Sequence, residues 1–337
     1  MGSGLPAPVC ETGVADASSL MGRWDEEIRP LSTRPDAGDD DGLNALIASS
    51  FVWTVGWVAL FYALSASQPW WCRSQSTKPH ENDRYWCARN LLGVLHSVLI
   101  AAICVPASFA FLTGPHSLQF AASQNLEWCS VDPSDPNYAW RWTGQAVAFS
   151  GLAFTTFTFA DIFISLFHGL ATWDYIVHHI AFVIAGSIIR GHCILPFNAA
   201  VLMAMEASTP FLNFVVFYRH RGTAYQTRLL VSGVVFFVSF VFFRIGLNGY
   251  GTVLLWIAQS RDSAIPHRVP AWEAWFLLVA VTAGAGVQLF WLKSVTASFW
   301  SRVKVLFQNG TGNVSMEEKE GEGAGQGERE RALLASG

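Results

Sequence analysis

The sequence is dominated by long apolar runs that are separated by short polar stretches. A run of about 20 apolar residues is long enough to cross a bilayer, and an α-helix satisfies its own backbone hydrogen bonds there. The pattern therefore predicts an all-α, polytopic membrane protein with about seven transmembrane helices. The predicted spans are residues 44–68, 88–113, 143–167, 175–189, 194–218, 229–258 and 271–292.

The two ends of the chain lack this pattern. Residues 1–43 are acidic and rich in Gly, Pro and Asp, and they lack the basic and apolar segments of a cleaved signal peptide. We therefore expect them to form a disordered tail. Residues 293–337 are expected to form an amphipathic stub on the membrane surface, which contains Phe299 and Trp300, followed by a disordered tail rich in Gly, Glu and Arg.

Composition agrees with a membrane protein and excludes other classes. Only 14% of the 337 residues are charged, whereas a soluble domain carries about 25%. A net charge of −4 without a basic block argues against a nucleic-acid partner. Six cysteines form no Cys-x-x-Cys pair, so we expect no zinc site, and nothing in the sequence indicates a cofactor. The oligomeric state stays open.

The distribution of Lys and Arg in the connections predicts the orientation, because these residues are enriched in cytosolic loops. One side of the membrane collects Arg73, Lys78, Arg84, Arg219, Arg221, Arg228, Lys293, Arg302 and Lys304, whereas the other collects Arg141, Arg190, Arg261 and Arg268. We therefore expect a lumenal N-terminus and a cytosolic C-terminus. Cys129 and Cys193 would both face the lumen, either as a disulfide or as two unpaired cysteines.

Polar residues inside the spans carry most of the functional information. A charged side chain at the bilayer centre costs about 3 kcal/mol on insertion scales, so such residues normally face protein or water. The residues concerned are His96, Asp161, His178, His179, Glu206, Asn213, Arg244 and Asn248. Because five different spans contribute them at the cytosolic half or the middle of the membrane, the sequence predicts an interior chamber with a polar lining.

Several of these residues also fit a purely structural role. His96 fits a hydrogen bond between helices, and Glu206 and Arg244 lie at similar depth and fit an ion pair. His178 and His179 point about 100° apart on a helix, so at most one of them faces a given chamber.

Four sequence blocks resemble the TLC-domain family. They are the segment from Asp161 to His179, the block Met205-Glu206-Ala-Ser208-Thr209-Pro210-Phe211-Leu-Asn213, the His96-Ser97 pair and the run Phe242-Phe243-Arg244-Ile245. The resemblance covers about residues 84–292. It implies that the last six helices form a TLC-type barrel around a chamber, with the first helix, 44–68, outside. It also implies an endomembrane location, in the endoplasmic reticulum or Golgi.

The chain departs from the ceramide synthases of this family. In those enzymes an adjacent histidine pair serves acyl transfer, and a His-Asp-x-x-Asp-x-x-Leu-Glu run follows it. When that Glu is aligned with Glu206, Asn198, Ala199 and Leu202 stand where the His and the two Asp should be, and Met205 replaces the Leu. The acids that would assist a catalytic histidine are absent, so we do not expect ceramide synthesis.

The function that the resemblance implies is to bind, sense or move lipid and so to influence membrane lipid composition. The ligand would be a membrane lipid or acyl chain, with its head near His178, His179, Asp161 and Glu206 and with His96, Asn213 and Arg244 in the lining. The first alternative is an acyltransferase that uses His178 or His179 on an acyl-CoA. The second is a seven-helix receptor, but the Asp-Arg-Tyr and Asn-Pro-x-x-Tyr patterns of common receptors are missing.

Overall fold

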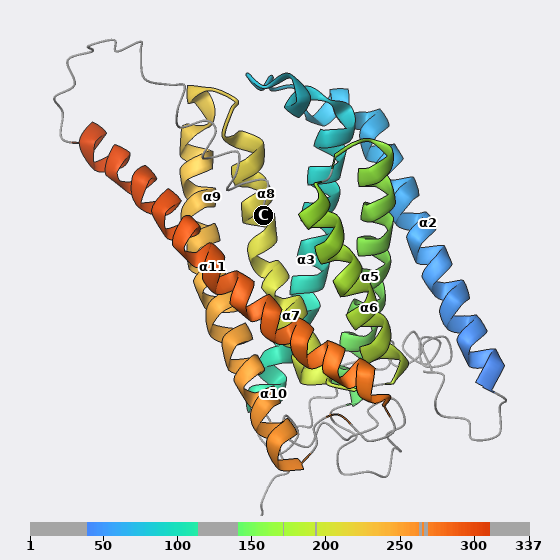
Figure 1. Cartoon of the computed structure of the whole chain (residues 1–337). Coiled ribbons are helices and arrows are strands. Elements are labelled where there is room, and N and C mark those ends of the chain that lie inside the picture. Colours follow the sequence, from blue (N-terminus) through green and yellow to red (C-terminus); the bar gives the residue numbers. More distant parts are fainter. Residues whose placement is uncertain are drawn as a thin grey trace, which may run out of the picture.

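The computed structural model describes residues 39–113, 141–170, 172–192, 194–262, 265 and 269–310. Within these residues the regular structure is entirely helical (Figure 1). The α-helices are α2 (Asp39–Trp71), α3 (Arg84–Thr113), α5 (Arg141–Phe167), α6 (Trp173–Gly191), α7 (Pro196–Ala204), α8 (Thr209–Tyr218), α9 (Gln226–Ser239), α10 (Asn248–Asp262) and α11 (Ala271–Gly310). Cys129, Cys193 and most of the two predicted tails, residues 1–38 and 311–337, lie outside the described residues.

The helices account for all seven predicted spans. Six described segments are long and apolar enough to cross a membrane, and α6 adds a shorter apolar helix, Tyr175–Gly191. The prediction of an all-α, polytopic membrane protein is therefore confirmed. The first helix begins at Asp39, five residues earlier than predicted, so the end of the expected acidic tail belongs to α2.

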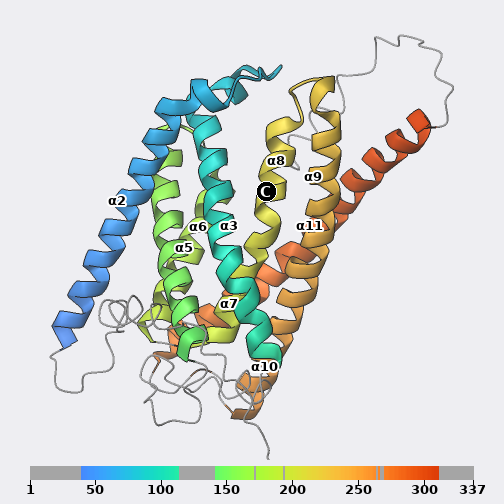
Figure 2. The same ribbon diagram turned by 180° about the vertical axis from the view of Figure 1, so that it is seen from behind.

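Six of the crossings form a closed ring. Around it, α3 contacts α5, α5 contacts α6, α6 contacts α11, α11 contacts α9, α9 contacts α8, and α8 returns to α3. Helix α2 packs on α3 and α5 from outside, and the view from behind shows it along one flank of the bundle (Figure 2). This is the arrangement of six helices with one outside that the resemblance to the TLC-domain family implied.

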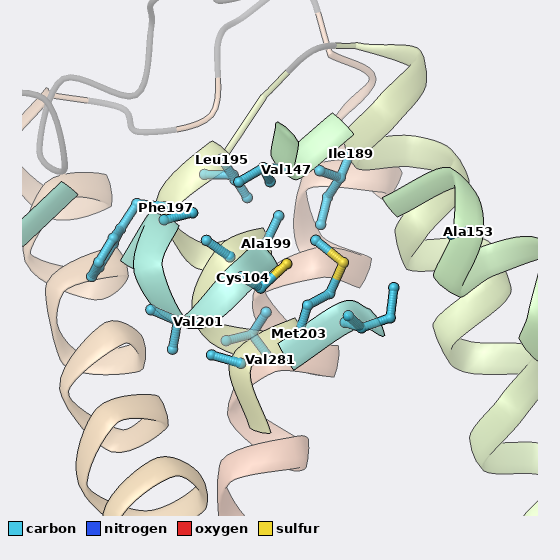
Figure 3. Packing of buried hydrophobic residues seen from close by; sticks show 14 of the residues in the cluster. Cys104, Val147, Ala153, Ile189, Leu195, Phe197, Ala199, Val201, Met203 and Val281 are labelled. Carbon is cyan, nitrogen blue, oxygen red and sulfur yellow. The ribbon is translucent and has the colours of Figure 1, made fainter. Parts of the chain in front are cut away.

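Helix α7 forms the centre of the hydrophobic core. It contacts α3, α5, α6 and α10, and eight of its nine residues are buried. Figure 3 shows Phe197, Ala199, Val201 and Met203 packed among residues of the neighbouring helices. The approach of α10 is so close that a Cβ on Gly251 would lie 3.1 Å from the side chain of Val201. Glycine at this position therefore allows the two helices to touch.

The fifth and sixth spans are not uniform α-helices, although the hydropathy pattern predicted each as one helix. A 3-10 turn, η3 (Met205–Ser208), separates α7 from α8, and a π-helical segment, η5 (Phe240–Leu247), separates α9 from α10. Pro210 explains the first irregularity, because proline has no amide hydrogen to donate to the preceding turn. The two irregular segments contact each other in the middle of the bundle.

The last helix is longer than predicted. The expected stub after residue 293 continues α11 without a break as far as Gly310, so that the helix has 40 residues. Its second half remains in contact with the bundle, because the ring of Phe299 stacks on that of Phe237 in α9 with the centroids 4.3 Å apart. Figure 1 shows α11 crossing the bundle obliquely.

A buried glutamate joins two connections at the end of the bundle where α2 ends. Glu81, in the short 3-10 turn η1 (Pro79–Asn82), is fully buried between α2 and α3. Its carboxylate accepts hydrogen bonds from Ser76 Oγ at 2.6 Å and from His220 Nδ1 at 2.7 Å. Arg219 lies 3.7 Å away, and Arg221 donates to the Glu81 carbonyl at 3.1 Å. The α2–α3 connection is thereby fastened to the connection after α8.

This network should make the stability of the protein sensitive to acid. Burial by itself raises the pKa of the Glu81 carboxyl, but the hydrogen bonds from Ser76 and His220 and the charges of His220 and Arg219 hold this pKa below its ordinary value. A group whose pKa is lowered on folding stabilises the fold at neutral pH. That stabilisation is lost as the pH falls through the lowered value.

We therefore expect Glu81→Gln to destabilise the protein by about 1.5–3 kcal/mol at pH 7.5, the range for hydrogen bonds to charged groups. As the pH falls through the lowered pKa of Glu81, the wild type loses the same interaction, so the two proteins should converge. Thermal unfolding of both proteins in one detergent, from pH 7.5 downwards, measures this. Equal melting temperatures at pH 7.5 would show that the carboxylate has no such role.

Candidate functional site

The strongest polar contact within the bundle joins α3 and α5. Asp161, on α5, is 2% exposed. Arg89, on α3, donates from Nε to one carboxylate oxygen at 2.9 Å and from Nη2 to the other at 3.2 Å. Paired bonds of this kind are the strongest that a guanidinium and a carboxylate form. The guanidinium of Arg89 therefore compensates the negative charge of Asp161.

Helix α6 joins the same carboxylate. The hydroxyl of Tyr175 donates to Asp161 Oδ2, and the Arg89 guanidinium lies over the Tyr175 ring, 4.4 Å from its centre. Arg89 also donates to the carbonyl of Leu170 in the α5–α6 connection at 3.3 Å. We call Arg89, Asp161, Tyr175 and His179 the Asp161 cluster. It fixes α3, α5 and α6 to one another at the end of the bundle that the charge bias assigns to the cytosol.

His179 is the histidine of the pair that faces this cluster. Its Nε2 lies 3.7 Å from Asp161 Oδ2, too far for a hydrogen bond, and its Nδ1 lies 2.9 Å from the carbonyl of Tyr175. A carbonyl only accepts, so Nδ1 carries the hydrogen. In the neutral imidazole the lone pair is then on Nε2.

His178 points in a different direction from His179. The two rings are nearly perpendicular, at 87°, with their centroids 5.7 Å apart. His178 is exposed on the surface of α6, and its ring contacts the edge of Phe182 at 4.5 Å. The adjacent histidines therefore do not converge on one site.

Glu206 and Arg244 do not form the ion pair that the sequence suggested. Glu206 accepts a hydrogen bond from Ser97 on α3 at 2.7 Å. Arg244 donates instead to Ser208 Oγ at 2.7 Å and to Thr209 Oγ1 at 2.9 Å. Arg244 Nη1 also donates to Gln288 Oε1 at 3.5 Å. Glu206 belongs to the irregular turn η3, and Arg244 bonds the last residue of that turn, Ser208, so the two charged side chains lie at the same turn without a direct ion pair.

His96, on α3, lies in an aromatic layer with residues of α2 and α5. Its ring stacks on Phe157 at 3.8 Å and also meets Trp57 on α2 at 5.7 Å. Within the described residues, neither His96 Nε2 nor Trp57 Nε1 has a hydrogen-bond partner. The predicted role of His96 in a polar lining therefore receives no support from its contacts.

Asn213 lies on α8 against the backbone of α3. A Cβ added to Gly93 would meet Asn213 Nδ2 at 3.1 Å. Asn213 therefore lies where α3 and α8 approach each other closely, and not at the wall of a wide chamber.

An apolar groove lies between α5, α6 and α7. It contains about 580 Å³ of space, part of it open to the surroundings. Its wall includes Gly151, Phe154, Phe182 and Leu202, and Arg190 is the charged residue among those that line it. Asp161, His179 and Glu206 are not part of this lining, so the head-group position expected from the sequence lies outside the groove. Phe182 separates the groove from His178, whose ring it contacts.

Sequence reasoning missed Arg89 and Tyr175. Arg89 lies five residues after the start of α3, and Asp161 lies six residues before the end of α5. Because the two helices run in opposite directions, these offsets place both residues at similar depth. The argument from depth that suggested the Glu206–Arg244 pair would thus have found Arg89. Tyr175 gave no comparable signal, because tyrosine is common at membrane interfaces.

The Arg89–Asp161 pair yields a prediction about stability. Replacing one partner of a buried ion pair leaves the other uncompensated, at a cost of about 3–5 kcal/mol, whereas replacing both removes the charge problem. We expect Arg89→Gln and Asp161→Asn each to be less stable than the double variant. Thermal unfolding of the wild type and the three variants measures the coupling. Additive losses in the double variant would contradict it.

Comparison with protein families assigns most of this architecture. Residues 87–296 match the model of the TLC domain, which is described by the names TRAM, LAG1 and CLN8. The comparisons with curated proteins and with solved structures give no match. The matched segment covers more than half of the chain and runs from the start of α3 into α11. It includes the Asp161 cluster, Glu206, Arg244 and the groove. With its ring of membrane-crossing helices and this match, the chain belongs to the TLC-domain family.

Proposed function

We propose that this integral membrane protein binds a membrane lipid by an acyl chain in the groove between α5, α6 and α7, and so influences membrane lipid composition. The observation that carries the proposal is the groove itself. The groove is partly open to its surroundings and encloses only about 60 Å³, so it fits a segment of an acyl chain rather than a whole lipid. Its walls are aliphatic and aromatic side chains, which suit a hydrocarbon chain.

An apolar wall alone gives little affinity inside a membrane. A lipid tail that leaves the bilayer for the groove exchanges one apolar environment for another, so selectivity depends on packing and polar contacts. Arg190, in the last turn of α6, is the charged group of the lining. We therefore propose that the bound lipid places an anionic head group near Arg190.

The family suggests a location, and the charge bias suggests an orientation. We propose an endomembrane location with a lumenal N-terminus and a cytosolic C-terminus, which would place the groove's Arg190 towards the lumen. The triplets Asn309-Gly-Thr311 and Asn313-Val-Ser315 would then stay unmodified. A glycosidase-sensitive mass shift at either asparagine would contradict this orientation.

The acyltransferase alternative has one observation in its favour, the lone pair of His179 Nε2 beside Asp161. The geometry of Asp161 weighs against it, because its oxygens bond Arg89 and Tyr175 and lie 3.7 Å from His179 Nε2, too far for a hydrogen bond. The positions of the missing His and acids also have other contacts. Asn198, at the His position, donates to the Gly251 carbonyl at 3.0 Å, and Ala199 and Leu202, at the acid positions, line the groove. The seven-helix receptor receives no support from the family match.

The groove can be blocked at Gly151, where a Cβ meets nothing within 4 Å. We expect Gly151→Phe to fill the groove and to reduce the lipid that co-purifies specifically by about tenfold or more, a loss of about 1.4 kcal/mol. Native mass spectrometry and lipid extraction measure the loss.

Gly286→Phe, on α11, is the matched control, because Gly286 also has open space and does not line the groove. Arg190→Gln should keep the acyl occupancy but lose the preference for anionic lipids. If Gly151→Phe retains the lipid of the wild type, the groove is not the binding site.

A second test addresses catalysis. Positioned acid–base assistance is typically worth about 10²–10⁴-fold, and Asp161 is not available to supply it. We expect the purified protein, given a long-chain base and an acyl-CoA, to form no more ceramide than the His178→Ala, His179→Ala double variant. Ceramide formation that depends on His179 would establish the acyltransferase instead.

A further inference from the structure

Two cysteines face each other where α2 ends and α3 begins, and neither belongs to the groove lining or to the Asp161 cluster. Cys72 directly follows the last residue of α2, and Cys87 lies in the first turn of α3. Their sulfur atoms are 3.5 Å apart. Both side chains are buried, but Cys72 is 8% exposed whereas Cys87 has no exposure. A disulfide has an S–S length of about 2.05 Å, so only a small side-chain movement separates this pair from a bond.

The surroundings hold the two thiols in register. The Arg221 guanidinium lies 3.9 Å from Cys87 Sγ and also donates to the carbonyls of Ser74 and Glu81. These bonds hold the α2–α3 connection near both cysteines, because Ser74 follows Cys72 closely and Glu81 precedes Cys87. The guanidinium also supplies a positive charge near Cys72, which favours the thiolate form of that residue.

We propose that Cys72 and Cys87 are a reversible redox pair, which forms a disulfide when the protein meets a peroxide. The more exposed Cys72 thiolate attacks one peroxide oxygen, the O–O bond breaks, and the released hydroxide takes a proton to leave as water. The Cys87 thiol then attacks the sulfur of the Cys72 sulfenic acid. The S–O bond breaks, and the thiol proton leaves with the hydroxyl group as a second water. In sum, two thiols lose two electrons and two protons, and the peroxide is reduced to two water molecules.

Electrostatics around Cys72 supports this order of attack. A hydrogen bond from the Cys87 thiol lowers the pKa of Cys72, and although burial opposes this shift, the charge of Arg221 adds to it. Cys87 is fully buried and serves as the resolving thiol. Other uses of the pair are less well supported, because the described residues contain no group of three or more His, Cys, Asp or Glu side chains that could hold a metal.

The orientation that we propose places the pair on the cytosolic side, where thiols are kept reduced. A disulfide there is transient rather than structural. When formed, it would tie α2, the helix outside the ring, to the start of α3. Arg89 lies two residues further along α3, so the bond would form beside the Asp161 cluster.

The test uses the full-length protein in lipid nanodiscs. The reduced protein is exposed to hydrogen peroxide, quenched in acid, denatured, alkylated and digested for mass spectrometry. We expect the loss of two alkylable thiols per chain, a peptide cross-linked through Cys72 and Cys87, and recovery of both thiols with dithiothreitol. Cys104, which is buried without a neighbouring cysteine in the described structure, should remain alkylable throughout.

Variants distinguish the two roles. Cys87→Ala should leave Cys72 as a sulfenic acid that dimedone traps, whereas Cys72→Ala should leave Cys87 as an unreacted thiol. Cys104→Ala is the matched control and should form the cross-link as the wild type does. The proposal is overturned if wild-type Cys72 and Cys87 both stay alkylable, if Cys72 pairs with a different cysteine, or if dithiothreitol does not restore the thiols.

Discussion

The rest of the bundle depends on one requirement, that the carboxylate of Asp161 must not remain uncompensated among apolar helices. Arg89 meets it with two hydrogen bonds, and Tyr175 adds a third from α6. These bonds fix the positions of α3, α5 and α6 relative to one another. Apolar packing alone would fix them less well in a membrane, because lipid tails are as apolar as the helix surfaces. The groove lies between two of these helices and α7, so its shape depends on the same register.

The crossings could be predicted from the sequence because hydropathy reports directly on what a bilayer tolerates. The irregular segments could not, since hydropathy is the same for α, 3-10 and π geometry, and only Pro210 hinted at a break. Asp161 was identified correctly as a residue that needs a partner. Its partner Arg89 was missed because an arginine near a helix end is ordinary. For His96 and Glu206 the sequence suggested a place in a shared chamber, which stays a prediction, and it could not reveal their contacts with Phe157 and Ser97 on neighbouring helices.

The family signature and the groove occupy different parts of the molecule. Asp161 and Glu206 bond residues of neighbouring helices at the polar positions, whereas the lining of the groove includes Ala199 and Leu202. The amide of Asn198, which is not part of that lining, bonds the backbone of α10. The TLC domain of this chain thus holds its polar contacts and its apolar groove at separate places.

The π-helical segment Phe240–Leu247 constrains how this sequence can vary in length. A π turn holds one residue more than an α turn, so this segment can absorb an extra residue without the rotation of about 100° that one residue adds in an α-helix. Asn248 and Thr252, which follow it, are buried. Loss of one residue within Phe240–Leu247 could therefore be accommodated by closing an α turn, whereas the same loss early in α10 would turn the residues beyond it towards different neighbours.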